Sequence, residues 1–144
     1  MCSSDLGDGV LIDQTSHVYT NEAGGMAALS GVLPRLLPGV RGIFTPDDVR
    51  AMLGTPSRFS VTTLATPITL LCVENTHNAG GGKIWPFEQL QEVTRVAKEK
   101  GVKTHLDGAR LWNASVAAGI PEKTYAQHFD SISVCFSKIG RAHV

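Results

Sequence analysis

The stretch Thr104–Gly119, which reads THLDGARLWNASVAAG, largely decides the fold expected for this chain. It begins with a short apolar run, carries the carboxylate of Asp107 at the end of that run, and continues into a small-residue helix near Arg110. Burying an unpaired carboxylate is costly or shifts its pKa, so a charge at this position needs a partner. We therefore expect a cationic group opposite Asp107. The structural alternative is that Asp107 caps the following helix.

Apolar runs and amphipathic segments alternate on both sides of this stretch. Strands are predicted at Gly9–Ile12, Ile68–Val73, Val102–Leu106 and Ile132–Phe136. Helices are predicted from Pro46 to Leu53 with Thr45 as N-cap, from Pro86 up to Gly101, and from Arg110 to Ala118 with Gly119 as its stop, and a turn or helix is predicted at His17–Gly25. Thr55–Pro67 is polar and expected to be irregular. This alternation is typical of an α/β fold with a mostly parallel sheet and flanking helices.

Composition excludes several classes of partner. The chain has 144 residues, 42% of them hydrophobic and 18% charged, with a formal net charge of zero. A neutral chain without a basic stripe is a poor ligand for nucleic acid or an anionic membrane, and the longest apolar run, Ile68–Val73, is too short to cross a bilayer. Cys72 and Cys135 lie in hydrophobic segments, so we expect buried, reduced thiols and a cytoplasmic location.

Polar residues follow three of the predicted strands. They are Glu74–Asn78, Asp107 and Ser137–Lys138. In parallel sheets ligands bind beyond the carboxyl ends of the strands, so this pattern predicts a ligand site there. No pair of His, Cys or acidic residues has the spacing of metal ligands, and no metal site is predicted.

Four motifs give the chain a resemblance to a known family. They are SHVYTNEAGG (Ser16–Gly25), ENTHN (Glu74–Asn78), HLDGARLWNA (His105–Ala114) and DSISVCFSK (Asp130–Lys138). In this order they resemble the threonine aldolases of the aromatic amino acid β-eliminating lyase family. The resemblance implies pyridoxal 5'-phosphate as cofactor and the aspartate aminotransferase fold (fold type I). Residues 7–138 would form the central part of its large, cofactor-binding domain.

The resemblance also implies roles for three cofactor-binding residues. Asp107 would pair with the pyridine nitrogen, because a protonated ring is the better electron sink. Lys138 would hold the cofactor covalently through its amine. His17 would stack on the ring. Without the resemblance, Lys138 would be interpreted as a solvated lysine and His17 as a capping or surface histidine.

Two further residues would serve the substrate. Arg110 resembles the ligand of the substrate α-carboxylate, a task that suits a bidentate guanidinium; the alternative is a surface ion pair. His77 resembles the histidine near the substrate hydroxyl, where it would act as a base directly or through water. The other two histidines considered, His105 and His128, are interpreted as structural.

The implied reaction is the retro-aldol cleavage of L-threonine or L-allo-threonine to glycine and acetaldehyde by a homo-oligomeric enzyme. The chain lacks the phosphate-binding turn and part of the carboxylate-binding set that the family possesses. We therefore expect it to have little or no aldolase activity by itself. Two alternatives stay open: another pyridoxal-phosphate β-eliminating lyase, related to tryptophanase, and a non-catalytic folded α/β fragment.

The two ends of the chain have related coding sequences. MCSSDL at residues 1–6 can be encoded by GTG TGC TCT TCC GAT CT, and the reverse complement of that string encodes Ile-Gly-Arg-Ala-His, as at residues 139–143. Complementary ends of this kind resemble a sequencing adapter read in frame. We expect Met1–Leu6 and Ile139–Val144 to be non-native tails that contribute no side chains to the core.

Overall fold

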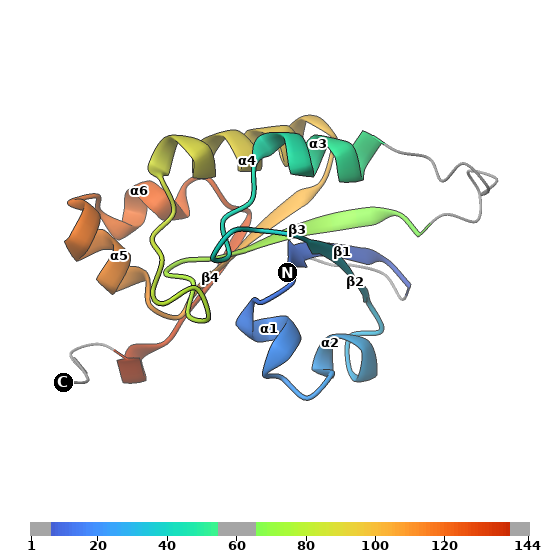
Figure 1. The fold of residues 1–144 in the computed structure, drawn as a ribbon, viewed down its shortest axis with the longest axis horizontal. Helices are drawn as coiled ribbons and strands as arrows, with labels where there is room; N and C mark the ends of the chain where they lie inside the picture. Colours follow the sequence, from blue (N-terminus) through green and yellow to red (C-terminus); the bar gives the residue numbers. More distant parts are fainter. Residues whose placement is uncertain (1–6, 55–65, 139–144) are drawn as a thin grey trace.

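The computed structural model describes residues 7–54 and 66–138, which form a parallel five-stranded sheet between two layers of helices (Figure 1). The strand order is β2-β1-β3-β4-β5, and every pair of neighbours runs parallel. The strands are β1 (Gly9–Asp13), β2 (Leu33–Leu37), β3 (Ile68–Glu74), β4 (Lys103–Gly108) and β5 (Ser131–Val134). The predicted α/β class and the mostly parallel sheet are confirmed.

Helices cover the two faces of the sheet unequally. On one face lie α3 (Pro46–Gly54) and α4 (Phe87–Glu99), with α5 (Leu111–Ala118) and α6 (Glu122–Ala126) beside them (Figure 1). Within residues 7–54 and 66–138, the opposite face carries only the two short helices α1 (His17–Thr20) and α2 (Gly25–Ala28).

The core is divided in the same way. The larger cluster, beneath α3 and α4, contains Leu71, Trp85 and Leu106, and the smaller cluster contains Val10 and Cys72. Alternating residues of one strand supply the two clusters, as expected for strands buried on both faces. The face beneath α1 and α2, which has the smaller cluster, is therefore the one with room for a ligand.

The predicted helix boundaries agree closely with the structure. At the start of α3, Asp48 N–H donates to Thr45 Oγ1 (3.1 Å) and Thr45 N–H donates to Asp48 Oδ2 (2.7 Å), which forms a reciprocal cap. At the end of α5, Gly119 adopts the left-handed conformation with φ of 68°. The predicted Thr45 cap and Gly119 stop are both confirmed.

Three elements were not predicted, β2, α2 and α6; the turn or helix expected at His17–Gly25 covers α1 and only the first residue of α2. β2 is an edge strand whose residues are mostly exposed or half-buried, and Pro34 and Arg35 interrupt its apolar run. Proline is tolerated there because an edge strand does not need every N–H in the ladder. α6 has five residues, too few to produce a helical period in the sequence.

Some expectations fall outside the described residues. The tails Met1–Leu6 and Ile139–Val144 lie there, as does most of the irregular segment expected at Thr55–Pro67.

The last predicted strand is shorter than expected: β5 ends at Val134, and a 3₁₀ turn follows at Phe136–Lys138. Within the described part of the chain, no helix is both long and apolar enough to span a bilayer.

Asp130 joins β4 to the start of β5 at the amino edge of the sheet. Its Oδ2 accepts hydrogen bonds from Thr104 N–H (2.9 Å) and Thr104 Oγ1 (2.8 Å), and Oδ1 lies 3.1 Å from Lys103 Nζ. Burial alone would raise the pKa of Asp130, but the bonds from Thr104 and the Lys103 charge lower it to about 2. The ionised form is thus favoured by folding.

We predict that Asp130→Asn lowers the free energy of unfolding at pH 7 by about 1 kcal/mol, the usual net contribution of an intramolecular hydrogen bond, because this partly exposed carboxylate gains less than a buried one. Because the folded-state pKa lies below the unfolded one, this stabilisation is present above about pH 4 and is lost towards pH 2. Urea titrations of parent and variant between pH 7 and pH 3 measure the difference. A difference that widens at low pH would contradict this assignment.

Candidate active site

The carboxyl edge of the sheet collects polar side chains from four neighbouring strands. β1 ends in Asp13, β3 ends in Glu74, β4 carries Asp107 and the turn after β5 carries Lys138. Glu74 and Asp107 lie opposite each other in the register of β3 and β4. Three of these strand ends were predicted to form a ligand site, and the structure brings all of them to one edge.

A cavity of about 290 Å³ lies at this edge, on the face that α1 and α2 partly cover. It is lined by His17, Asp107 and Lys138, together with Val18, Glu22, Cys72, His105, Ala109, Ser133 and Cys135. Three of the five predicted site residues, from three separate segments of the chain, therefore share one cavity.

Asp107 and Lys138 face the same cavity without forming an ion pair. Among the described residues, no ion pair within 4.0 Å joins their charged atoms. Asp107 Oδ1 accepts a hydrogen bond from Ala109 N–H (3.1 Å), whereas α5 begins two residues later with no side-chain cap. The alternative of Asp107 as a helix cap is therefore wrong, and its carboxylate is available to a ligand.

His17 is held at the cavity by its own segment. Its Nε2 lies 3.0 Å from Glu22 Oε1, and its Nδ1 lies 3.1 Å from Asn21 Nδ2. Because the Asn21 amide group donates to Nδ1, the ring proton is assigned to Nε2, towards Glu22. Both ring nitrogens are thus used locally, and the ring lines the cavity.

The structure does not bring the other two predicted residues to this cavity. Arg110 is half-buried at the N-cap position of α5, and its guanidinium has no hydrogen bond or ion pair with another described residue. His77 is fully buried, with none of its surface exposed to solvent. Neither Arg110 nor His77 is among the residues that line this cavity, and their roles stay predictions.

His77 instead belongs to a buried cluster with two carboxylates. Its Nε2 lies 3.3 Å from Asp13 Oδ1 and 3.6 Å from Glu74 Oε2, while Gly80 N–H donates to its Nδ1 (3.1 Å). Burial alone would raise the pKa of Asp13, but the His77 ring and two hydrogen bonds from Thr15 outweigh it and lower this pKa. Asp13 is therefore ionised at neutral pH beside a histidine whose Nε2 carries the proton.

Asp13 was missed in the sequence, although the rule that identified the other strand ends applies to it. It directly follows the predicted strand Gly9–Ile12, as Glu74 follows Ile68–Val73. Its carboxylate also accepts the N–H of Gly39 (3.0 Å), which ties β1 to the loop after β2.

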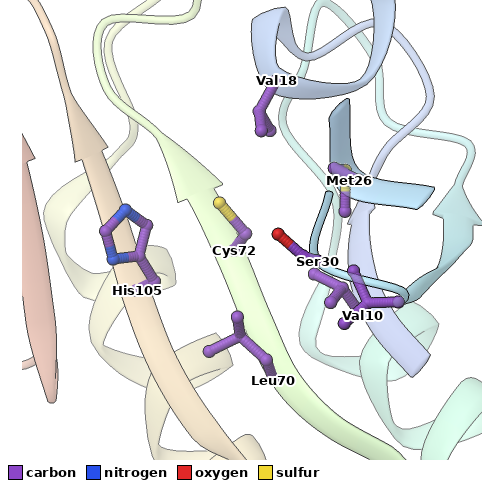
Figure 2. Close-up of a pocket in the computed structure, with 8 residues that line it drawn as sticks. Val10, Val18, Met26, Ser30, Leu70, Cys72 and His105 are labelled. Carbon is purple, nitrogen blue, oxygen red and sulfur yellow. The ribbon is translucent and has the colours of Figure 1, made fainter. Parts of the chain in front are cut away.

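Cys72 and His105 line the cavity that contains Asp107 and Lys138. They also line a second cavity of about 390 Å³ beneath α1 and α2. Figure 2 shows the two side chains on adjacent strands, with Val18 and Met26 on the helical side. Burial, with the nearby charges of Asp107 and Glu74, raises the pKa of the Cys72 thiol to about 12, so this thiol is protonated at neutral pH.

The interpretations of the thiols and of His105 hold in part. Cys72 is buried and free as expected, whereas Cys135 is free but only half-buried. His105 has the expected structural contact, since its Nδ1 lies 2.8 Å from Ser131 Oγ. Burial lowers the pKa of His105, which is partly offset by the Asp107 charge, so a neutral ring lies beside this carboxylate.

Two glycines allow the loop after β2 to pack against the buried cluster. A Cβ at Gly42, whose φ is 83°, would overlap the His77 ring, and one at Gly39 would overlap Asp13 Oδ2. At position 42 only glycine both leaves room for the His77 ring and adopts the left-handed backbone conformation without strain.

Comparison with known proteins gives consistent matches. The family model described as "Beta-eliminating lyase" matches residues 1–144. A protein of Candida albicans named low-specificity L-threonine aldolase is 38% identical over 130 residues, which are 90% of this chain and 33% of that protein. The chain spans about a third of the length of the curated relatives that it matches.

Solved structures share the fold. The structure named Leishmania major threonine aldolase has a TM-score of 0.66 and 25% identity, over 79% of this chain and 31% of that one. An aspartate aminotransferase from Thermus thermophilus, at 21% identity, has a TM-score of 0.53 over 74% of this chain and 25% of that one. The predicted aspartate aminotransferase fold is thereby confirmed.

We predict that Gly42→Ala destabilises the chain by roughly 2–4 kcal/mol more than Gly119→Ala does, because it adds overlap with the His77 ring to the left-handed strain. Gly119 is the matched control, since its φ is also positive (68°) and a Cβ there meets no atom within 4 Å. Urea-induced unfolding of the two variants measures both effects. Equal losses of stability would show that His77 is not confined by this loop.

Proposed function

The chain belongs to the beta-eliminating lyase family, and we propose on this basis that residues 7–138 are the central part of the cofactor-binding domain of a threonine aldolase. The reaction is the pyridoxal-phosphate-dependent cleavage of L-threonine or L-allo-threonine to glycine and acetaldehyde. Because the chain spans about a third of its relatives' length, this is the activity of a longer protein. The low activity expected of this chain alone follows from the same fact.

One observation carries the proposal. His17, Asp107 and Lys138 come from three separate segments and line one cavity in which the carboxylate and the amine do not pair with each other. An ion pair would neutralise both groups, so their separation leaves a carboxylate for a ring nitrogen and an amine for an aldehyde. The side chains present therefore fit pyridoxal phosphate.

Bound pyridoxal phosphate supplies an electron sink for negative charge at the substrate α-carbon. The Asp107 carboxylate would hold a proton at the pyridine nitrogen, and the neutral His105 ring beside it adds no competing positive charge. Lys138 would anchor the cofactor through its amine, and the His17 ring would lie along it. Asp107, Lys138 and His17 would together orient the cofactor.

Arg110 and His77 are proposed to act on the substrate. The guanidinium of Arg110 suits an α-carboxylate, and within the described residues it has no other partner. His77 is proposed as the base for the substrate hydroxyl; because Nε2 carries a proton and Nδ1 accepts the N–H of Gly80, this role requires the bond from Gly80 to open. The complete burial of His77 favours transfer through water over direct contact.

We extend the proposal to partners and location. The substrate is a small β-hydroxy amino acid, the whole protein is a homo-oligomer, and neither nucleic acid nor a membrane is a partner. The free thiols of Cys72 and Cys135 support a cytoplasmic role in amino acid metabolism. A tryptophanase-like lyase is not favoured, because the curated relatives bear the name threonine aldolase.

We predict that pyridoxal phosphate followed by sodium borohydride labels Lys138 several-fold more than Lys123, an exposed lysine on α6. A preorganised site raises the local reactivity of its lysine, whereas an exposed lysine reacts only according to free concentration. Peptide mapping by mass spectrometry gives the ratio of the two labels within one sample. Asp107→Asn should reduce this ratio and leave the label on Lys123 unchanged.

Equal labelling of Lys138 and Lys123 would contradict the cofactor assignment. A preference for Lys138 that survives Asp107→Asn unchanged would instead contradict the role of Asp107. Circular dichroism of the variant separates either result from a loss of fold.

A further inference from the structure

We propose that Glu74 is a positioning residue whose carboxylate holds α1 against the sheet and thereby orients His17 over the cavity. Glu74 is the last residue of β3 and belongs to the buried cluster around His77. The functional part of the inference rests on the proposed function, in which His17 lies along the cofactor. The structural part rests on the contacts of the carboxylate alone.

Each oxygen of the Glu74 carboxylate accepts one backbone N–H group, and Oε2 also lies 3.6 Å from His77 Nε2. Oε2 accepts the N–H of His17 (2.9 Å), and Oε1 accepts the N–H of Asn78 (2.9 Å). The side chain is buried, so both bonds are screened little by solvent. The carboxylate therefore joins the first residue of α1 to the loop that contains His77.

α1 has few other contacts that fix its position. None of its four residues is buried, although Val18 packs against the smaller core cluster. Its N-cap residue, Ser16, donates its hydroxyl to the Asp13 carbonyl (2.6 Å) and makes no side-chain cap. The first N–H groups of a helix have no partner inside the helix, and a negative charge near them is favourable. Glu74 thus supplies from the sheet the cap that the local sequence does not supply.

Glu74 itself is firmly anchored. Its carbonyl oxygen accepts the indole N–H of the buried Trp85 (3.1 Å), and the next residue, Asn75, donates its N–H to the carbonyl of Asp107 (3.0 Å). β3 therefore fixes the position of the Glu74 carboxylate, and this carboxylate fixes α1, which carries the cavity-lining ring of His17. A substitution at Glu74 should act on the cofactor through His17, whereas its contact with the His77 ring (3.6 Å) concerns the proposed substrate residue and not the labelling of Lys138.

The test compares Glu74→Gln with Asp130→Asn, in the whole chain. Both replace a carboxylate that binds backbone N–H groups by an amide, but Asp130 lies at the opposite edge of the sheet. The single carbonyl oxygen of glutamine can accept only one of the two N–H groups, and its NH₂ group then faces the other donor. The first readout is the hydrogen exchange of the His17 amide by NMR.

We expect this exchange to accelerate about tenfold or more in Glu74→Gln, the effect of losing a charge-assisted hydrogen bond, and to change no more than other amides in Asp130→Asn. An unchanged His17 amide in Glu74→Gln would overturn the proposal. So would an equal acceleration at His17 in the control, because the effect would then be one of general stability.

The second readout is the ratio of pyridoxyl label on Lys138 to that on Lys123, measured in Glu74→Gln, His17→Ala and the double variant. If Glu74 acts through His17, the double variant shows no lower ratio than His17→Ala alone. If the ratio in the double variant falls by the two single-variant factors multiplied together, the two residues act independently, and the claim that Glu74 acts through His17 is overturned.

The two hypotheses fail in different ways. If the parent chain labels Lys138 no more than Lys123, the proposed function fails, and the exchange of the His17 amide alone decides whether Glu74 holds α1. If the parent labels Lys138 selectively and Glu74→Gln leaves both the ratio and the amide unchanged, the proposed function stands and the role of Glu74 is overturned.

Discussion

Two carboxylates lie side by side at the carboxyl edge of the sheet, and most of the surrounding structure depends on how their charges are accommodated. The parallel register of β3 and β4 pairs Glu74 with Asp107, and side chains paired in this way point to the same face. Two adjacent negative charges repel each other unless each has its own donors. Glu74 binds the N–H groups of His17 and Asn78, whereas the Asp107 carboxylate, among the described residues, accepts only the N–H of Ala109 and faces a cavity.

This division separates a structural carboxylate from one with free capacity. Glu74 has a backbone donor at each carboxylate oxygen and fixes α1 and the loop after β3. Asp107 has a donor at one oxygen and can accept a proton-bearing or cationic ligand atom. The nearby charges also act on Cys72, whose pKa of about 12 keeps its thiol protonated and weakly nucleophilic at neutral pH. A reactive aldehyde in this cavity would therefore meet one available amine, Lys138, and little competition from Cys72.

The fold could be predicted from the sequence because its signals are local. Apolar runs identified β1, β3, β4 and β5, and the Thr45 cap and Gly119 stop identified the ends of helices. β2 escaped because its pairing with β1 is a tertiary effect that overrides an interrupted pattern.

The site was predicted less completely than the fold. Strand ends and motifs indicated His17, Asp107 and Lys138, but motifs give no distances. The burial of His77 between Asp13 and Glu74 depends on the loop after β2, which contacts it across a long stretch of sequence. Side-chain contacts of this kind cannot be read from residue spacing.

The bond between His17 and Glu74 also has a kinetic consequence, since it joins residues 57 positions apart. Closing a loop of this length costs conformational entropy, and parallel pairing of distant strands forms slowly. α1 is too short to persist as an isolated helix in water, so it acquires a fixed position only after β3 has paired with β1. During folding the cavity is therefore completed late, and its walls are formed by the sheet before the segment that carries His17 closes over it.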